Sequence, residues 1–446
     1  WAVVTVLPLV IPSYVGGFAV LAALGPRGLL QEYVAGPLLG LERIPEIAGF
    51  PGATLTLTLL SYPYVLLTVR ASLRRMDPSV EEAARGLGRS GLSRFLRVVL
   101  PQLRPAIAAG ALLVALYALS DFGAVSLLRY EAFSYVVYLQ YEGGAAALAA
   151  ASSMVLVVLA VGILVLEGRT RGGPRYYPSG VGTVRPAAVL PLNRWRWPAT
   201  AFCGLVALAS LAMPMGVLAL WLARGLREGQ SLGLEWSTVF NSLYVSLLAA
   251  AAAVVAALPV AYLAVRYAGG WAAFLERISY IGFALPGIVV AIALVFFGAN
   301  YLGPLYQGLA LLVFAYVVLF LPAVLGAARA SLLQVSPRVE DAARGLGKRP
   351  HQVFGTITLP LIRPGVLAGG ALVFLVTMKE LPATLILGPI GFKTLATSVW
   401  SAAESALFAQ AAAPALLLVL VSSVPMVVLT LGHGMKSRGD DRTVLP

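Results

Sequence analysis

The sequence predicts an all-α polytopic membrane protein, and three observations support this fold class. Hydrophobic residues make up 59% of the 446 residues and charged residues only 11%, whereas a soluble domain has about 25% charged residues. The mean hydropathy is +0.88. Apolar runs of about 20 residues, the length that crosses the hydrocarbon core of a bilayer, recur along the whole chain. This composition excludes an ordinary soluble enzyme.

Ten such runs define the predicted membrane spans. They lie at residues 1–24, 52–69, 106–128, 145–166, 198–222, 239–265, 278–299, 308–328, 365–388 and 410–432.

The distribution of Lys and Arg predicts how the chain is oriented. Of 32 such residues, 25 lie in one set of alternate loops and 6 in the other. Because basic residues are retained on the cytoplasmic side, the richer set and the C-terminus are predicted to be cytoplasmic. The net charge of +13 then faces anionic lipid, and nucleic-acid binding is not expected. The basic loops are 70–105, 167–197, 266–277, 329–364 and 433–446.

A segment of the sequence occurs twice. Residues 70–105 and 329–364 align without a gap at an offset of 259 residues, and 18 of 36 positions are identical. Six predicted spans separate the copies, so both copies face the same side. The halves are therefore predicted to be parallel repeats, whereas inverted-repeat secondary transporters place matching segments on opposite sides.

The repeat divides the chain into a first repeat at 1–167, a cytoplasmic linker rich in Arg, Gly and Pro at 168–197, a second repeat at 198–434 and a cytoplasmic tail at 435–446. The second repeat has six predicted spans and the first has four. By symmetry, two spans are expected to be missing from the start of the first repeat. The chain also begins at Trp1 inside an apolar run, so the natural N-terminus is expected to lie further upstream.

Each copy of the repeated segment predicts a short helix, a tight turn and a second helix. The first helix begins at a proline after a capping residue, Asp77 or Ser336. Glycines end it and permit the turn: Gly86 and Gly88 in one copy, Gly345 and Gly347 in the other. The second helix is expected to stop at a Leu-Pro pair, Leu100 and Pro101 or Leu359 and Pro360. Two such loops suit a two-fold symmetric cytoplasmic partner; the alternative is a pair of solvated loops left from gene duplication.

These loops resemble a known motif. The pattern E-A-A, three residues, G, nine residues, I-x-L-P is similar to the cytoplasmic loop of permease subunits of binding-protein-dependent ABC importers. The first copy has Glu82, Ala83, Ala84, Gly88, Leu100 and Pro101, with Val in place of Ile. The second has Asp341, Ala342, Ala343, Gly347, Leu359 and Pro360, with Asp in place of Glu. Two loops in one chain resemble the fused permeases of iron(III), thiamine and related importers. Residues 11–18, 120–123 and 379–384 resemble the iron(III) branch most.

The resemblance implies two six-helix permease repeats in the cytoplasmic (inner) membrane of a bacterium or archaeon. It implies that the loops seat in two cytoplasmic ATP-binding-cassette subunits, which would hold ATP and Mg, and that an extracytoplasmic solute-binding protein delivers the substrate. The chain itself has no G-x-x-x-x-G-K-[ST] motif, so no catalytic residue and no cofactor are assigned to it. Thiamine or another small solute is the alternative substrate. An ion-coupled secondary transporter and a membrane-embedded enzyme are less favoured alternatives.

Three charged residues fall inside predicted spans. Asp121 and Glu380 are related by the same offset of 259 residues, and Lys379 adjoins Glu380. An ionised residue at a helix centre costs roughly 2.5–3.5 kcal/mol to insert, so these residues are expected to face the protein interior. We predict that they line the translocation path or its gate; the alternative is a structural pair between Lys379 and Asp121. With two distant histidines and Cys203 alone, no metal site is predicted.

Overall fold

The computed structural model describes residues 1, 3–25, 28–41, 47–76, 78–171, 192–267 and 269–440. Every regular element in these ranges is a helix, which confirms the predicted all-α class. Nine of the helices are long and apolar enough to cross a membrane, and a shorter apolar helix spans Ser13–Leu24.

The first repeat runs from the start of the chain to α9. Its long helices are α3, α6 and α9, and α1 is a short apolar helix. The bounds are α1 (Ser13–Leu24), α2 (Gly36–Leu39), α3 (Gly49–Arg75), α4 (Pro78–Gly86), α5 (Gly91–Arg94), α6 (Leu100–Ser120), α7 (Gly123–Leu127), α8 (Phe133–Glu142) and α9 (Ala146–Arg171).

In the second repeat α14 corresponds to α1 and α15–α21 correspond to α3–α9, and α10–α13 precede them. Its bounds are α10 (Arg196–Ala207), α11 (Met213–Arg227), α12 (Trp236–Arg266), α13 (Gly270–Ala284), α14 (Gly287–Phe297), α15 (Leu309–Leu332), α16 (Pro337–Gly345), α17 (Pro350–Val353), α18 (Leu359–Met378), α19 (Pro382–Leu387), α20 (Leu395–Glu404) and α21 (Phe408–Asp440).

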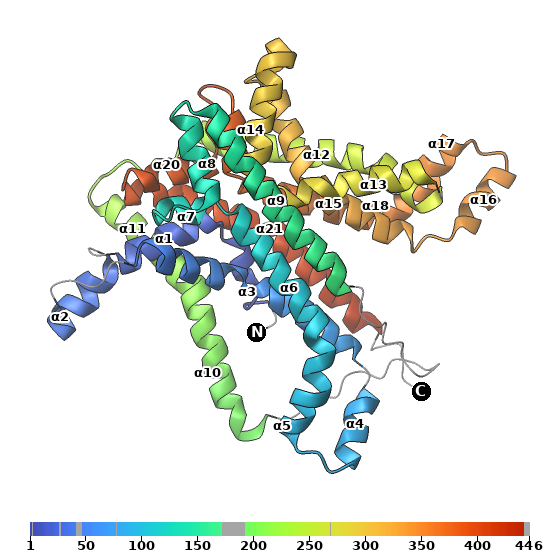
Figure 1. Ribbon diagram of the computed structural model, residues 1–446, viewed down its shortest axis with the longest axis horizontal. Helices are drawn as coiled ribbons and strands as arrows, with labels where there is room; N and C mark the ends of the chain where they lie inside the picture. The colour runs from blue at the N-terminus through green and yellow to red at the C-terminus, as the bar shows by residue number, and fades with distance from the viewer. Residues whose placement is uncertain are drawn as a thin grey trace.

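Two arms diverge from a common base (Figure 1). In one arm α3 packs against α6, and in the other α12, α15 and α18 pack together. The arms end at α4 and α16, which lie far apart in Figure 1; we call this side of the molecule the basic end. The opposite side, which we call the packed end, is formed by α1, α7, α8, α11 and α20. Its buried side chains form the largest hydrophobic cluster and join the two repeats.

Several of the ten predicted spans are shortened or broken in the structure. The run at 1–24 contains the short 3-10 helix η1 (Leu7–Val10) and the 12-residue helix α1. The helix α1 rises about 18 Å and is shorter than the hydrocarbon core. The runs at 106–128, 278–299 and 365–388 are each broken into two helices. A break exposes backbone groups that need partners, so hydropathy finds the apolar run but not the break.

The prolines of the two Leu-Pro pairs do not end a helix, contrary to the prediction. Pro101 and Pro360 lie in the first turn of α6 and α18, and the helix continues through both. A π-helical turn precedes each proline, η3 (Phe95–Val99) and η8 (Phe354–Thr358). Proline lacks the N–H that an α-helical turn requires, and the wider turn accommodates this loss. The second helix of each loop is therefore continuous with a membrane span.

Parts of the predicted domain plan lie outside the described residues. These include most of the linker at 168–197, the capping residue Asp77 and the last residues of the tail. Within the described part, α21 extends to Asp440, beyond the predicted end of the last span at 432. The domain boundaries remain predictions.

Candidate functional site: two coupling helices and a central cavity

The helices α4 and α16 repeat the same local geometry, and we call them the coupling helices. Each has nine residues, with acidic residues in the first turn and an arginine in the last. Gly88 and Gly347 have positive φ angles of 74° and 83°. This conformation is unfavourable for any residue that has a Cβ atom. The tight turn predicted after each helix is confirmed. Ser336 occupies the predicted capping position, although its side chain makes no capping hydrogen bond.

Each coupling helix ends in an exposed leucine. Leu87 is 81% exposed and Leu346 is 86% exposed, and the two are related by the repeat. On the same helices Ala84 and Ala343 are buried against the arm, whereas Glu82, Ala83, Asp341 and Ala342 are exposed. A large apolar side chain exposed at the same place in both repeats is typical of an anchor for a binding partner. The motif did not single out these leucines.

In the second repeat the coupling helix is anchored to its arm by Glu340. This carboxylate is 1% exposed. Its Oε1 accepts hydrogen bonds from Nε and Nη2 of Arg266 at 3.1 and 3.0 Å and from the Thr358 hydroxyl at 3.0 Å. Arg266 ends α12 and Thr358 precedes α18, so one side chain ties α16 to two membrane helices. A buried charge with several hydrogen-bonded partners is costly to break.

The equivalent residue of the first repeat, Glu81, is held differently. Its side chain is 32% exposed and lies 3.8 Å from Nε of Arg94. The counterpart of Thr358 is Val99, which has no hydroxyl to donate. In the motif the acidic residue is Glu82 or Asp341. The acidic side chain that turns toward the arm, however, is that of the preceding residue, Glu81 or Glu340. In the sequence, this preceding residue is marked only by its position three residues before the buried alanine, Ala84 or Ala343, on the same face of the helix.

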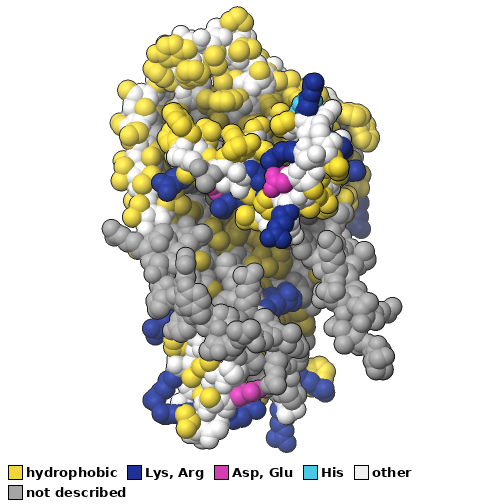
Figure 2. Space-filling view, turned by 90° about the vertical axis from the view of Figure 1, so that its right-hand side faces the viewer, with side chains coloured by type: hydrophobic (Ala, Val, Ile, Leu, Met, Phe, Trp, Pro, Cys, Tyr) yellow, Lys and Arg dark blue, Asp and Glu magenta, His cyan; other side chains and the backbone are white. Residues whose placement is uncertain are grey.

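Basic side chains gather around the coupling helices. Figure 2, seen from the side where α16 and α17 lie, shows Lys and Arg over its middle and lower parts, whereas the top is largely hydrophobic. This distribution agrees with the loop counts from the sequence.

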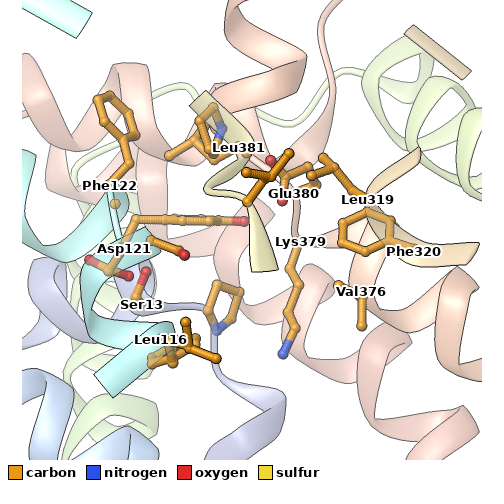
Figure 3. Close-up of a pocket in the computed structure, with 18 of the residues that line it drawn as sticks. Ser13, Leu116, Asp121, Phe122, Leu319, Phe320, Val376, Lys379, Glu380 and Leu381 are labelled. Carbon is orange, nitrogen blue, oxygen red and sulfur yellow. The ribbon is translucent and has the colours of Figure 1, made fainter. Parts of the chain in front are cut away.

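Asp121, Lys379 and Glu380 line one cavity of about 280 Å³ between the two repeats. The structure therefore brings together three residues that the sequence predicted to face the interior. Figure 3 shows Asp121 and Ser13 on one wall, and Glu380 and Lys379 on the other. Most of the remaining lining is apolar, from residues such as Leu116, Leu319, Phe320 and Val376.

The two acidic residues cap short helices at the breaks in the spans. Asp121 Oδ1 accepts a hydrogen bond from the Ala124 N–H at 3.0 Å, and Glu380 Oε1 accepts one from the Ala383 N–H at 3.2 Å. Each acceptor is thus paired with the N–H three residues ahead, at the start of α7 or α19. Both acids therefore lie at breaks between helices and not at the centre of a helix. A capped break leaves a carboxylate in the interior without leaving the backbone unpaired.

The two acids differ in the residue that faces them. Ser13 lies beside Asp121 (Figure 3), but its counterpart near Glu380 is Gly287. A Cβ atom on Gly287 would lie 2.8 Å from Glu380 Oε1. Glycine at this position therefore makes room for the longer acid.

Lys379 does not form the alternative pair with Asp121. Its Nζ donates to the carbonyl oxygen of Leu9 at 2.7 Å, a contact that crosses between the repeats. In Figure 3 its side chain extends away from Glu380. Among the described residues, no ion pair involves any of these three charged side chains, so Lys379 joins the repeats by a backbone contact instead.

An aromatic cluster joins the repeats at the packed end, next to the cavity. The ring of Trp400 lies 5.8 Å from those of Phe122 and Tyr138, and its Nε1 donates to the Ser126 hydroxyl at 3.0 Å. Trp400 belongs to the second repeat and the other three to the first. This cluster was not predicted, because its members are about 270 residues apart and share no motif.

The described residues contain no group of three or more His, Cys, Asp or Glu side chains arranged to hold a metal ion. The cavity is therefore not a preformed cage of these ligands, and its chemistry rests on two carboxylates, one ammonium group and several hydroxyls.

Comparison with known proteins identifies the type of chain. The family described as "Binding-protein-dependent transport system inner membrane component" matches residues 2–168 and 253–435. The two matched segments fall in the two repeats, one in each.

Three relatives are permeases named for ferric transport. The Fe(3+)-transport system permease protein FbpB 2 of Haemophilus influenzae is 37% identical over 95% of this chain and 80% of its own length. The putative ferric transport system permease protein FbpB 1 of the same organism is 25% identical over 86% of this chain and 63% of its own length. The ferric transport system permease protein FbpB of Actinobacillus pleuropneumoniae is 24% identical, over 85% and 60% respectively.

Proposed function

This chain belongs to the family of binding-protein-dependent transport system inner membrane components, and we propose on that premise that it translocates iron(III) for an ABC importer. It is a multi-pass inner membrane permease, that is, a transporter subunit. The names of its relatives and their coverage of this chain support iron(III) as the substrate. The proposed partners are two cytoplasmic ATP-binding-cassette subunits, which bind ATP and Mg, and an extracytoplasmic binding protein.

The observation that carries this proposal is the pair of coupling helices on one end of the molecule. Both present an exposed leucine beside a positive-φ glycine, at positions related by the repeat. A dimer of ATPase subunits offers two equivalent grooves, one for each helix. The basic side chains at this end and the C-terminus then face the cytoplasm, in keeping with the positive-inside rule.

The mechanism follows from the two arms. ATP binding closes the ATPase dimer and draws α4 and α16 toward each other. The arms move with them, because each second loop helix is continuous with a membrane span. Closure at the basic end opens the packed end, where the contacts of Trp400 hold the repeats together. The central cavity is then exposed to each side in turn, and Asp121, Lys379 and Glu380 lie on the path.

Docking is tested by changing the exposed leucines. We expect Leu87→Asp and Leu346→Asp each to reduce co-purification of the ATPase subunits, and the double variant to abolish it, because a carboxylate in an apolar pocket is costly. Leu87→Met and Leu346→Met keep the apolar bulk and serve as controls. Undiminished co-purification of the double aspartate variant would refute docking at these helices.

The substrate is tested with the complete transporter in lipid vesicles, with its binding protein outside and ATP on the ATPase side. We expect ATP-dependent accumulation of radioactive iron supplied as ferric citrate, and none of thiamine. Accumulation of thiamine without iron would replace the proposed substrate and leave the permease assignment intact. Accumulation without ATPase subunits would favour an ion-coupled transporter.

A further inference from the structure

The central cavity contains a tyrosine whose hydroxyl has no partner among the described residues. Tyr14 is 2% exposed and lines the cavity from the start of α1. Its hydroxyl forms no hydrogen bond with any described residue. A buried polar group without a partner lowers stability, and such groups commonly mark a function. The hydroxyl is therefore available to a ligand in the cavity.

Glu380 offers a second free oxygen. Its Oε1 accepts the capping hydrogen bond from Ala383, but Oε2 accepts none from the described residues. Glu380 and Tyr14 line the same cavity. Gly287 supplies the space that this carboxylate occupies.

Asp121 lies on the opposite wall of the cavity, in the first repeat (Figure 3). It lies beside Ser13, the residue before Tyr14 (Figure 3). Gly123 allows this close approach, since a Cβ atom there would lie 2.8 Å from Cβ of Tyr14. The nearest ammonium group, that of Lys379, is directed to the Leu9 carbonyl. Two carboxylates therefore line the cavity, and neither forms an ion pair within the part of the chain that the structure describes.

We propose that Tyr14, Asp121 and Glu380 form a transient site for a hard trivalent cation as it passes through the cavity. The inference rests on the proposed function and names the ligands of its substrate. Phenol and carboxylate oxygens are hard donors, which suit cations of high charge rather than soft metals. The Tyr14 hydroxyl binds as phenolate, and its proton passes to water. A few protein ligands bind loosely enough for the ion to leave, as transport requires.

The test uses the complete transporter in lipid vesicles with ferric citrate as the probe. We expect wild type bound to iron to show the visible charge-transfer absorption of an iron–phenolate pair. Tyr14→Phe should abolish that absorption and reduce iron uptake at least tenfold. It removes only a hydroxyl that has no protein partner, so folding should be retained. Glu380→Gln keeps the capping acceptor and should reduce uptake at least threefold.

The matched control is Tyr62→Phe, which removes a tyrosine hydroxyl on α3 outside the cavity and should leave absorption and uptake unchanged. If wild type takes up iron but shows no such absorption, or if Tyr14→Phe leaves uptake unchanged, the site is wrong while the proposed function stands. If wild type takes up thiamine and no iron, the proposed function fails and this site with it.

Discussion

The two coupling helices share a sequence but not an anchor. Both α4 and α16 have the same length, the same exposed leucine and the same positive-φ glycine after them. Yet Glu340 is buried among Arg266, Thr358 and Tyr262, whereas Glu81 is half-buried beside Arg94. The local geometry of each coupling helix is therefore determined by the repeated sequence. Its attachment to the arm depends on the side chains that surround it. The coupling helix α16 is held to its arm by buried hydrogen bonds of Glu340, whereas the contact of α4 through Glu81 is partly exposed.

Removing the anchor should have the largest effect. Glu340→Ala leaves the Arg266 guanidinium buried without its partner, which typically costs about 3–5 kcal/mol. Glu81→Ala breaks an ion pair that is partly exposed, worth about 0–1 kcal/mol. We expect thermal unfolding of the purified protein to show a much lower Tm for the first variant only. Equal shifts would mean that both helices are anchored alike.

Removing a single hydrogen bond to the anchor should have an intermediate effect. Thr358→Val keeps the side-chain shape and removes the hydroxyl that donates to Glu340. Hydrogen bonds to charged groups contribute about 1.5–3 kcal/mol. The control is Thr356→Val, which removes an exposed hydroxyl of the same π turn. A Tm drop confined to Thr358→Val, with weaker coupling of ATP hydrolysis to uptake, would establish that Glu340 needs this donor.

The smallest effect should be equal in the two repeats. Gly88→Ala and Gly347→Ala each place a Cβ in the left-handed region, which costs about 1–2 kcal/mol. Nothing lies within 4 Å of either added Cβ, so the cost is one of backbone conformation alone. We expect the two variants to lower Tm by similar amounts. A clear difference would show that tertiary contacts reach the turns as well as the anchors.

A second comparison concerns the acids in the cavity. Asp121 and Glu380 occupy equivalent breaks and cap equivalent helices, but one faces Ser13 and the other Gly287. The repeat and the insertion cost of a charge placed both acids in the interior correctly. The break at Asp121 was not predicted, because the apolar run continues past this residue. Hydropathy does not register which backbone groups are paired.

The sequence alone determined the helical membrane class, the parallel repeat, the sidedness of charge and the turns at Gly88 and Gly347. These features depend on composition, periodicity and local backbone preference, all of which can be read from the sequence without knowledge of tertiary contacts. Tertiary contacts set the other features: Glu340 anchors a coupling helix, the Tyr14 hydroxyl has no hydrogen-bond partner among the described residues, and Lys379 donates to the Leu9 carbonyl. Each of these depends on contacts between helices, and Lys379 and Leu9 are 370 residues apart. The packing of the helices determines these partners. The same polar side chain can therefore gain a hydrogen-bond partner in one packing and lack one in another.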